Sequence, residues 1–201
     1  MNTRVNKNRL VLLMIAGVPV MIILAASWLW YYVSSGRIDL VAILGTANRG
    51  ELLSPPLALA DFAPRTAAGD SFEIAAAAPP IWRILIPGEG SCDEACRQTL
   101  YYTRQINTAM GKYANRIERV YLAAAERDAG LAEELAQTYP DLKVLYTAPA
   151  SMASLGSDAD GQMAGYFVVD PAGWIILSYA ADADGKDVMA DLKFLIKNSG
   201  G

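Results

Sequence analysis

The chain has 201 residues, of which 53% are hydrophobic, and it carries a formal net charge of −4 at pH 7. It contains no histidine, which excludes Ser-His and Cys-His nucleophiles and histidine-based zinc sites. The length suffices for a tether and one domain of ordinary size, and the acidic balance argues against binding to nucleic acid.

Residues 10–32 contain no charged side chain and are long enough to cross a bilayer as a helix. Residues 1–9 hold Arg4, Lys7 and Arg9, so we expect this tail to stay in the cytoplasm. A cleavable signal peptide, cut near residues 25–27, is the alternative. Tryptophan and tyrosine side chains at the far end favour an uncleaved single-pass anchor in the inner membrane, with the remaining chain in the periplasm.

Residues 33–68 are predicted to form a linker and an extended strap. Within them, Pro55 and Pro56 are incompatible with a regular helix. The part of the chain after the anchor carries 14 Lys and Arg against 21 Asp and Glu, which suits a basic protein partner. A periplasmic location would also allow disulfides to form and persist.

Residues 69–201 have the pattern of one α/β domain. Apolar runs at 81–86, 119–123 and 143–147 predict strands, and amphipathic segments that begin at 92 and 129 predict the helices between them. A hairpin is predicted at 165–179, where Asp170, Pro171 and Gly173 have the residue order of a type I turn. A final helix follows residues 182–185. This order predicts a thioredoxin-like three-layer sandwich with a mixed central sheet.

The only two cysteines, Cys92 and Cys96, lie at the predicted start of the first helix of this domain. Ser91 and Glu94 have the spacing of a capping box, which predicts Ser91 as the N-cap and Cys92 as the first helical residue. Residues at i and i+4 on a helix have Cβ atoms about 5–6 Å apart, against about 3.8 Å in a relaxed disulfide. We therefore expect a strained bond suited to exchange, or two thiolates holding a soft metal ion. A pair that only packs under the helix is the alternative.

Charged neighbours define the expected chemistry of this pair. The carboxylates of Asp93 and Glu94 disfavour a thiolate at Cys92, and Arg97 is expected to pair with Asp93 at i,i+4 spacing. These features predict a weak thiol–disulfide oxidoreductase, a reductant or a non-catalytic pair rather than a strong oxidant. Cys92 is expected to be the more exposed, attacking thiol, and Cys96 the resolving one.

Three features are shared with a known family: the N-terminal anchor, the Cys92-x-x-x-Cys96 pair after a strand, and Tyr166-Phe-Val-Val-Asp-Pro-Ala-Gly173. The last is similar to a Tyr-Leu-Ile-Asp-Pro-x-Gly hairpin. On these features the chain resembles the SCO/SenC family of membrane-anchored thioredoxin-fold proteins, which assist copper delivery to cytochrome c oxidase. The resemblance implies a role in oxidase assembly, with an oxidase subunit or another assembly factor as the protein partner.

The resemblance also implies a metal site, and here the chain departs from the family pattern. Family members bind copper with two cysteines and a histidine shortly before the hairpin tyrosine, and this chain has no histidine. Cu(I) would then depend on Cys92 and Cys96, with Met163 or Met152 as a third ligand, although ordinary packing also accounts for both methionines. Three functions stay open: exchange without a cofactor, a non-enzymatic binding module that keeps the fold, and a Cu(I) carrier with a degraded site.

Overall fold

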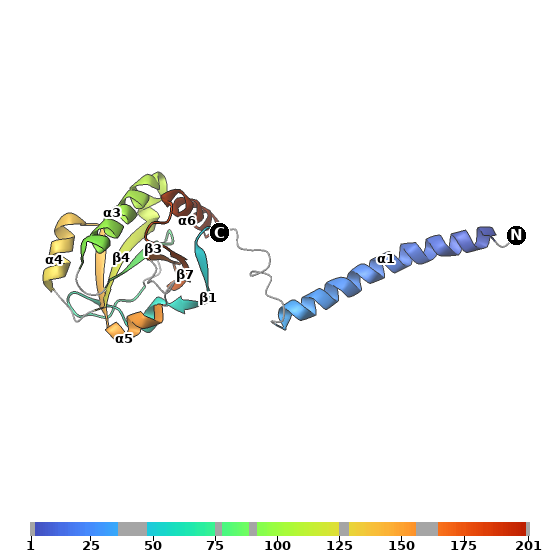
Figure 1. Ribbon diagram of the computed structural model, residues 1–201, viewed down its shortest axis with the longest axis horizontal. Coiled ribbons are helices and arrows are strands. Elements are labelled where there is room, and N and C mark those ends of the chain that lie inside the picture. Colours follow the sequence, from blue (N-terminus) through green and yellow to red (C-terminus); the bar gives the residue numbers. More distant parts are fainter. Residues whose placement is uncertain are drawn as a thin grey trace. The chain divides into compact units, whose positions relative to one another are not determined.

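The computed structural model describes residues 3–35, 48–74, 78–88, 92–124, 129–155 and 165–199 (Figure 1). The chain divides into two compact units, Met1–Ala47 and Asn48–Gly201. The first unit is built on one helix, α1 (Thr3–Ser34), whose segment Val11–Ser34 is long and apolar enough to cross a membrane. The predicted anchor falls within this helix, which continues through Pro19.

The second unit is built on a seven-stranded mixed sheet with the strand order β1-β7-β6-β3-β4-β5-β2. The strands β3, β4 and β5 run parallel, and the other neighbouring strands pair antiparallel. The bounds are β1 Glu51–Ala58, β2 Arg65–Thr66, β3 Trp82–Gly88, β4 Ile117–Ala124, β5 Leu142–Thr147, β6 Tyr166–Val169 and β7 Trp174–Tyr179. The three parallel strands are the apolar runs that the sequence predicted as strands.

Helices cover both faces of this sheet, so the unit is a three-layer sandwich (Figure 1). Their bounds are α3 Glu94–Ala109, α4 Ala129–Thr138, α5 Pro149–Met152 and α6 Gly185–Asn198, with the short 3-10 helices η1 Leu59–Phe62, η2 Gly111–Arg116 and η3 Ala153–Leu155. Alternate residues of a strand point to opposite faces. Ile84 and Ile86 therefore pack with α3, α4 and α6, whereas Leu85 packs with η1 and α5. The predicted thioredoxin-like α/β architecture is confirmed.

The hairpin between β6 and β7 closes through the predicted turn. The Oδ1 atom of Asp170 accepts hydrogen bonds from the backbone N–H groups of Ala172 and Trp174, at 2.9 and 2.8 Å. Gly173 has a φ of 96°, a backbone region that glycine adopts without steric cost. The hairpin places β6 next to β3, the strand that leads to the cysteines.

The sheet includes two strands that precede residue 69, the predicted start of the domain. β1 pairs with β7, and its register shifts across the segment that holds two adjacent prolines. Just before β1, the Oδ2 atom of Asp191 on α6 accepts hydrogen bonds from the backbone N–H groups of Arg49 and Gly50, at 2.8 and 3.0 Å. Because the strap is hydrogen-bonded to β7 and α6, the compact unit begins at Asn48, earlier than the sequence pattern indicated.

Candidate redox site

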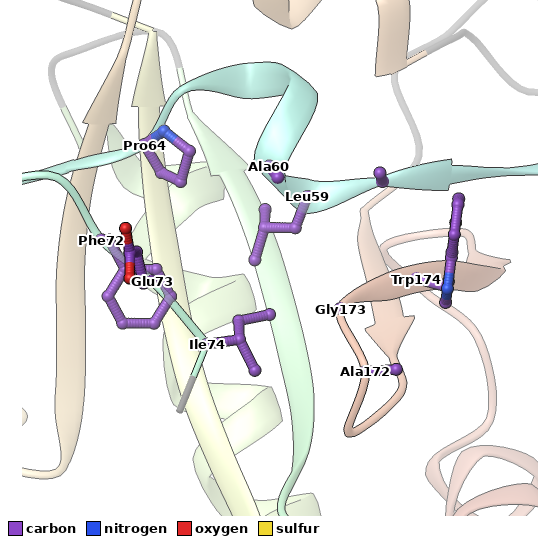
Figure 2. Close-up of a pocket in the computed structure, with 10 residues that line it drawn as sticks. Leu59, Ala60, Pro64, Phe72, Glu73, Ile74, Ala172, Gly173 and Trp174 are labelled. Carbon is purple, nitrogen blue, oxygen red and sulfur yellow. The ribbon is translucent and has the colours of Figure 1, made fainter. Parts of the chain in front are cut away.

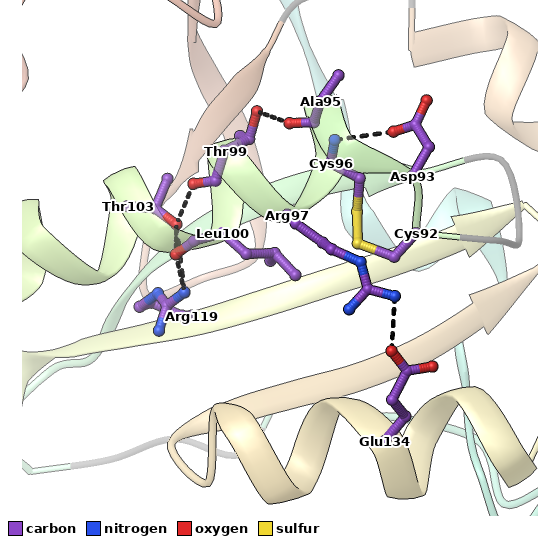
Figure 3. The surroundings of a disulfide bond; sticks show 10 residues. All are labelled: Cys92, Asp93, Ala95, Cys96, Arg97, Thr99, Leu100, Thr103, Arg119 and Glu134. Atoms are coloured by element: carbon purple, nitrogen blue, oxygen red, sulfur yellow. Dashed lines mark hydrogen bonds and ion pairs between the residues drawn. A yellow bond between two sulfur atoms is a disulfide. The ribbon is translucent and has the colours of Figure 1, made fainter.

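The two cysteines form a disulfide between the end of β3 and the first turn of α3 (Figure 3). The Cα atoms of Cys92 and Cys96 are 5.2 Å apart. The carboxyl ends of the central parallel strands are the edge at which open α/β sheets present their chemistry. The pair therefore lies at the strand-to-helix junction that the sequence predicted for it.

The helix begins later than predicted, because Asp93 rather than Ser91 is its N-cap. The Oδ1 atom of Asp93 accepts a hydrogen bond from the backbone N–H of Cys96 at 2.9 Å, and α3 starts at Glu94. Ser91 lies outside the described residues, and Cys92 precedes the helix instead of opening it. Because only Cys96 is in the helix, the Cβ–Cβ distance expected for residues i and i+4 of a helix does not apply to this pair. Their Cα distance lies within the range of roughly 4.4–6.8 Å found in ordinary disulfides, so the predicted strain was based on a wrong premise.

The two cysteines differ in exposure, in the order opposite to the predicted one. Cys92 is 7% exposed and belongs to the core cluster beneath α3, whereas Cys96 is half-buried and packs against that cluster. The expectation that Cys92 is the more exposed thiol is therefore wrong. Its side chain turns into the core just before the helix starts, and this leaves Cys96 as the more exposed residue of the pair.

The charged side chains around the disulfide pair differently from the prediction. Arg97 Nη2 lies 2.6 Å from Oε1 of Glu134 on α4, so the predicted Asp93–Arg97 ion pair is replaced by a contact between two helices (Figure 3). Asp93 is engaged instead as the helix cap. Both Asp93 and Glu94 are exposed beside the half-buried Cys96. Among the described residues, the surface beside Cys96 therefore carries an excess of negative charge.

The side chains present do not fit a copper site of the SCO/SenC type. The chain has no histidine, and among the described residues no three His, Cys, Asp or Glu side chains are grouped as metal ligands. Met152 is 3% exposed in the cluster on the opposite face of the sheet from Cys92, so it is not a third ligand. Met163 lies outside the described residues. Cys92 and Cys96 alone would offer two sulfur ligands, once reduced.

A tyrosine that the sequence reasoning did not single out lies under this site. Tyr121 on β4 is 0% exposed, belongs to the same core cluster as Cys92, and its hydroxyl has no hydrogen-bond partner among the described residues. Burial, together with the negative charge of Asp93, raises the pKa of Tyr121 to about 12. The only sequence signal was a tyrosine inside a predicted strand, which is ordinary for a sheet core.

A cavity of about 310 Å³ borders the other face of the sheet, away from the disulfide. Figure 2 shows the side chain of Leu59, the first residue of η1, directed toward Ile74, with the hairpin turn at Gly173 beside them. Trp174 closes one side and is 45% exposed. The lining is apolar apart from Glu73, so the cavity offers a packing surface and no nucleophile or acid–base pair.

A three-layer sandwich with a disulfide between a central strand and the next helix defines a thioredoxin-like domain. The family described as "Transmembrane-like, thioredoxin-like, C-terminal domain" matches residues 82–199, and the chain belongs to this family. The match spans the disulfide, the hairpin and α6. No match was found among curated proteins.

Solved structures of Sco proteins share the fold. ScoI from Arabidopsis thaliana with copper bound is 14% identical over 74% of this chain and 98% of that chain, with a TM-score of 0.51. A SCO1/SenC family lipoprotein from Bacillus anthracis is 11% identical over 74% of this chain and 99% of that chain, with a TM-score of 0.51. Yeast Sco1 with copper bound is 16% identical over 76% and 95%, with a TM-score of 0.50. At these identities the likeness establishes the fold that the SCO/SenC resemblance implied.

Proposed function

We propose that this protein is a membrane-anchored, SCO-like thiol–disulfide exchange protein that assists assembly of cytochrome c oxidase. The observation that carries the proposal is the disulfide itself. It lies at a strand–helix junction, and one of its two residues, Cys96, is only half-buried. The assembly role is supported by a structure of similar fold, BsSco, described as a member of the Sco family of cytochrome c oxidase assembly proteins. The helix α1 supports anchoring, and its basic tail supports a cytoplasmic N-terminus with the domain in the periplasm.

The substrate would be a dithiol or disulfide in a partner protein, such as the copper-site cysteines of an oxidase subunit. Exchange proceeds by attack of a thiolate on a disulfide sulfur through a mixed disulfide, and the two cysteines supply the sulfur atoms that this reaction needs. The exposure of the two side chains favours Cys96 as the sulfur that is attacked, with Cys92 as the leaving group. No cofactor takes part in these steps.

The test is the redox equilibrium of the full-length protein in detergent with glutathione. Thiols are trapped by alkylation and the mass shift is read for wild type and for Cys96→Ser. We expect a reversible couple in which both thiols appear together, because a single intramolecular bond is reduced. A disulfide that no thiol opens in the native protein would exclude exchange.

Further experiments separate the two alternative functions. A strain that carries Cys92→Ser and Cys96→Ser should lose oxidase activity as a deletion strain does; normal assembly in the double variant but not in the deletion would favour a non-enzymatic binding module. A Cu(I) competition titration of reduced wild type and reduced Cys92→Ser tests whether the protein is a Cu(I) carrier. Copper binding that depends on Cys92 would support a Cu(I) carrier with a degraded site.

A further inference from the structure

The hydroxyl of Tyr121 is a buried polar group that the described part of the fold leaves unused. The side chain is 0% exposed, and its oxygen has no hydrogen-bond partner among the described residues. A buried hydroxyl without a partner is costly, because it loses its hydrogen bonds to water and gains none in exchange. Replacement by phenylalanine would remove that cost, so the oxygen contributes nothing to the stability of the disulfide form.

The position of this hydroxyl connects it with the segment that carries Cys92. A Cβ atom added to Gly88, the last residue of β3, would lie 2.0 Å from the Tyr121 oxygen, so the hydroxyl lies directly against the Gly88 backbone. Asp93, on the other side of Cys92 in the chain, is close enough for its charge to act on the same hydroxyl. Gly88 and Asp93 bracket Cys92, which packs in one core cluster with Tyr121. The hydroxyl thus lies at the end of β3, in the part of the core that borders the segment carrying the cysteine that becomes the leaving group.

The protonation state of Tyr121 decides what its hydroxyl can do there. Burial raises the pKa of Tyr121 to about 12, whereas an ordinary cysteine thiol ionises near about 8.5. The hydroxyl therefore keeps its proton throughout the pH range in which thiols react. It can donate a hydrogen bond to a sulfur anion, but it does not itself give up the proton.

We propose that the Tyr121 hydroxyl donates a hydrogen bond to the sulfur of Cys92 when the disulfide opens. This inference rests on the exchange function proposed above and deepens it. A partner thiolate attacks Cys96 Sγ and forms a new S–S bond with it, while the Cys92–Cys96 bond breaks and its electron pair stays on Cys92 Sγ. The partner sulfur is oxidised and Cys92 is reduced to a thiolate, so electrons balance without a cofactor. In the buried site of Cys92, this anion needs a hydrogen-bond donor.

The experiment compares Tyr121→Phe with Tyr166→Phe in the full-length protein in detergent. Tyr166 is a matched control, because it is also 0% exposed and its hydroxyl also has no partner among the described residues. The readouts are the rate at which dithiothreitol opens the disulfide, the equilibrium with glutathione, and the melting temperature of the oxidised form. For Tyr121→Phe we expect opening on the order of tenfold slower and a glutathione equilibrium shifted toward the disulfide by a similar factor.

The melting temperature of oxidised Tyr121→Phe should be equal to or higher than that of wild type, because the substitution removes a buried hydroxyl without a partner. Tyr166→Phe should stay within about twofold of wild type in both redox readouts. Wild-type redox behaviour in Tyr121→Phe would overturn the inference, as would equal losses in both variants. An oxidised Tyr121→Phe that melts lower or fails to fold would also overturn it, since the hydroxyl would then have a structural partner. Failure of the exchange function itself appears separately, as a wild-type disulfide that dithiothreitol does not open.

Discussion

Arg97 on α3 pairs with Glu134 on α4, where Arg97 Nη2 lies 2.6 Å from Glu134 Oε1. It does not pair with Asp93, which lies one turn earlier as the N-cap of α3. Arg97, the residue that follows Cys96, is thus matched to a carboxylate on another helix. The ion pairs of the described residues include neither Asp93 nor Glu94. The surface beside Cys96 therefore keeps an excess of negative charge.

This excess predicts that positively charged thiols open the disulfide faster than negatively charged ones. Two unit charges about 7 Å apart in water interact by about 0.6 kcal/mol, which corresponds to about threefold in rate for each unmatched carboxylate. The two reagents differ by two unit charges, so we expect cysteamine to react more than about tenfold faster than 3-mercaptopropionate at low salt, after correction for the thiolate fraction of each reagent. The preference should shrink at about 1 M salt, where the Debye length is about 3 Å. Stopped-flow or alkylation-trapped rates measure it.

The variant Glu94→Gln provides the control for this charge effect, because it removes one unmatched charge and leaves the N-cap at Asp93 intact. Because the two reagents differ by two unit charges, its preference for cysteamine should fall by about 1.2 kcal/mol, or about sevenfold. An equal rate for both thiols in wild type at low salt would contradict the prediction. So would a preference that salt does not change.

The N-cap at Asp93 predicts a separable effect on stability. Asp93→Ala removes the acceptor for the Cys96 backbone N–H and should lower the free energy of unfolding of the oxidised protein by about 1 kcal/mol. Asp93→Asn keeps a side-chain oxygen in place and should cost only a few tenths of that. Denaturant unfolding of the full-length protein measures both. Equal losses in the two variants would show that the charge of Asp93, and not its cap, matters for stability.

The fold could be predicted from the sequence because strand and helix periodicity is local. Local sequence was enough to predict the strands β3, β4 and β5, which are apolar runs. It was also enough for the Asp-Pro-x-Gly turn of the hairpin. The role of β1 could not be predicted in the same way. Its two prolines argue against a strand, and only pairing with β7, more than a hundred residues later, makes it one.

The site was predicted in part. Cys92 and Cys96 are brought together as expected, because their spacing is short and a helix follows. The helix start was wrong by two residues, since Ser91 and Asp93 are both good caps and the sequence does not rank them. The burial of Cys92 depends on packing between α3 and the sheet, which no local pattern reports. Tyr121 was missed for the same reason.

A buried arginine provides a test of what holds α3 to the sheet. The side chain of Arg119 on β4 is 0% exposed, and burial lowers the pKa of its guanidinium against the opposing effect of Asp141. Nη1 lies 3.0 Å from Asp141 Oδ2, and Nη2 donates to the backbone oxygen of Leu100 at 2.6 Å. The side chain of Asp141 is 45% exposed, so solvent screens part of the interaction. Asp141→Asn leaves the buried cation without its carboxylate and should destabilise the protein by about 2 kcal/mol.

The exposed pair of Arg97 and Glu134 is the matched control for that variant. Glu134→Gln breaks a contact of similar length at the surface and should cost at most about 1 kcal/mol. Urea unfolding of both variants beside wild type measures the difference. A loss for Asp141→Asn no larger than that for Glu134→Gln would show that the remaining contacts with Leu100, Thr103 and Tyr139 suffice for the buried cation.

Three buried tyrosines predict how stability changes at alkaline pH. Burial raises the pKa values of Tyr121, Tyr166 and Tyr179 above the ordinary 10.0, that of Tyr121 to about 12. Because the folded chain holds these protons more tightly than the unfolded chain, their contribution is complete below pH 10 and is lost as pH rises toward 12 and beyond. Each should steepen the loss by about 1.4 kcal/mol per pH unit in that window. Denaturant unfolding across the window, with tyrosinate absorbance as a second readout, should show a slope that Tyr166→Phe reduces by about a third. Ionisation of all tyrosines near pH 10 without unfolding would contradict this, because it would place the three phenols in contact with water.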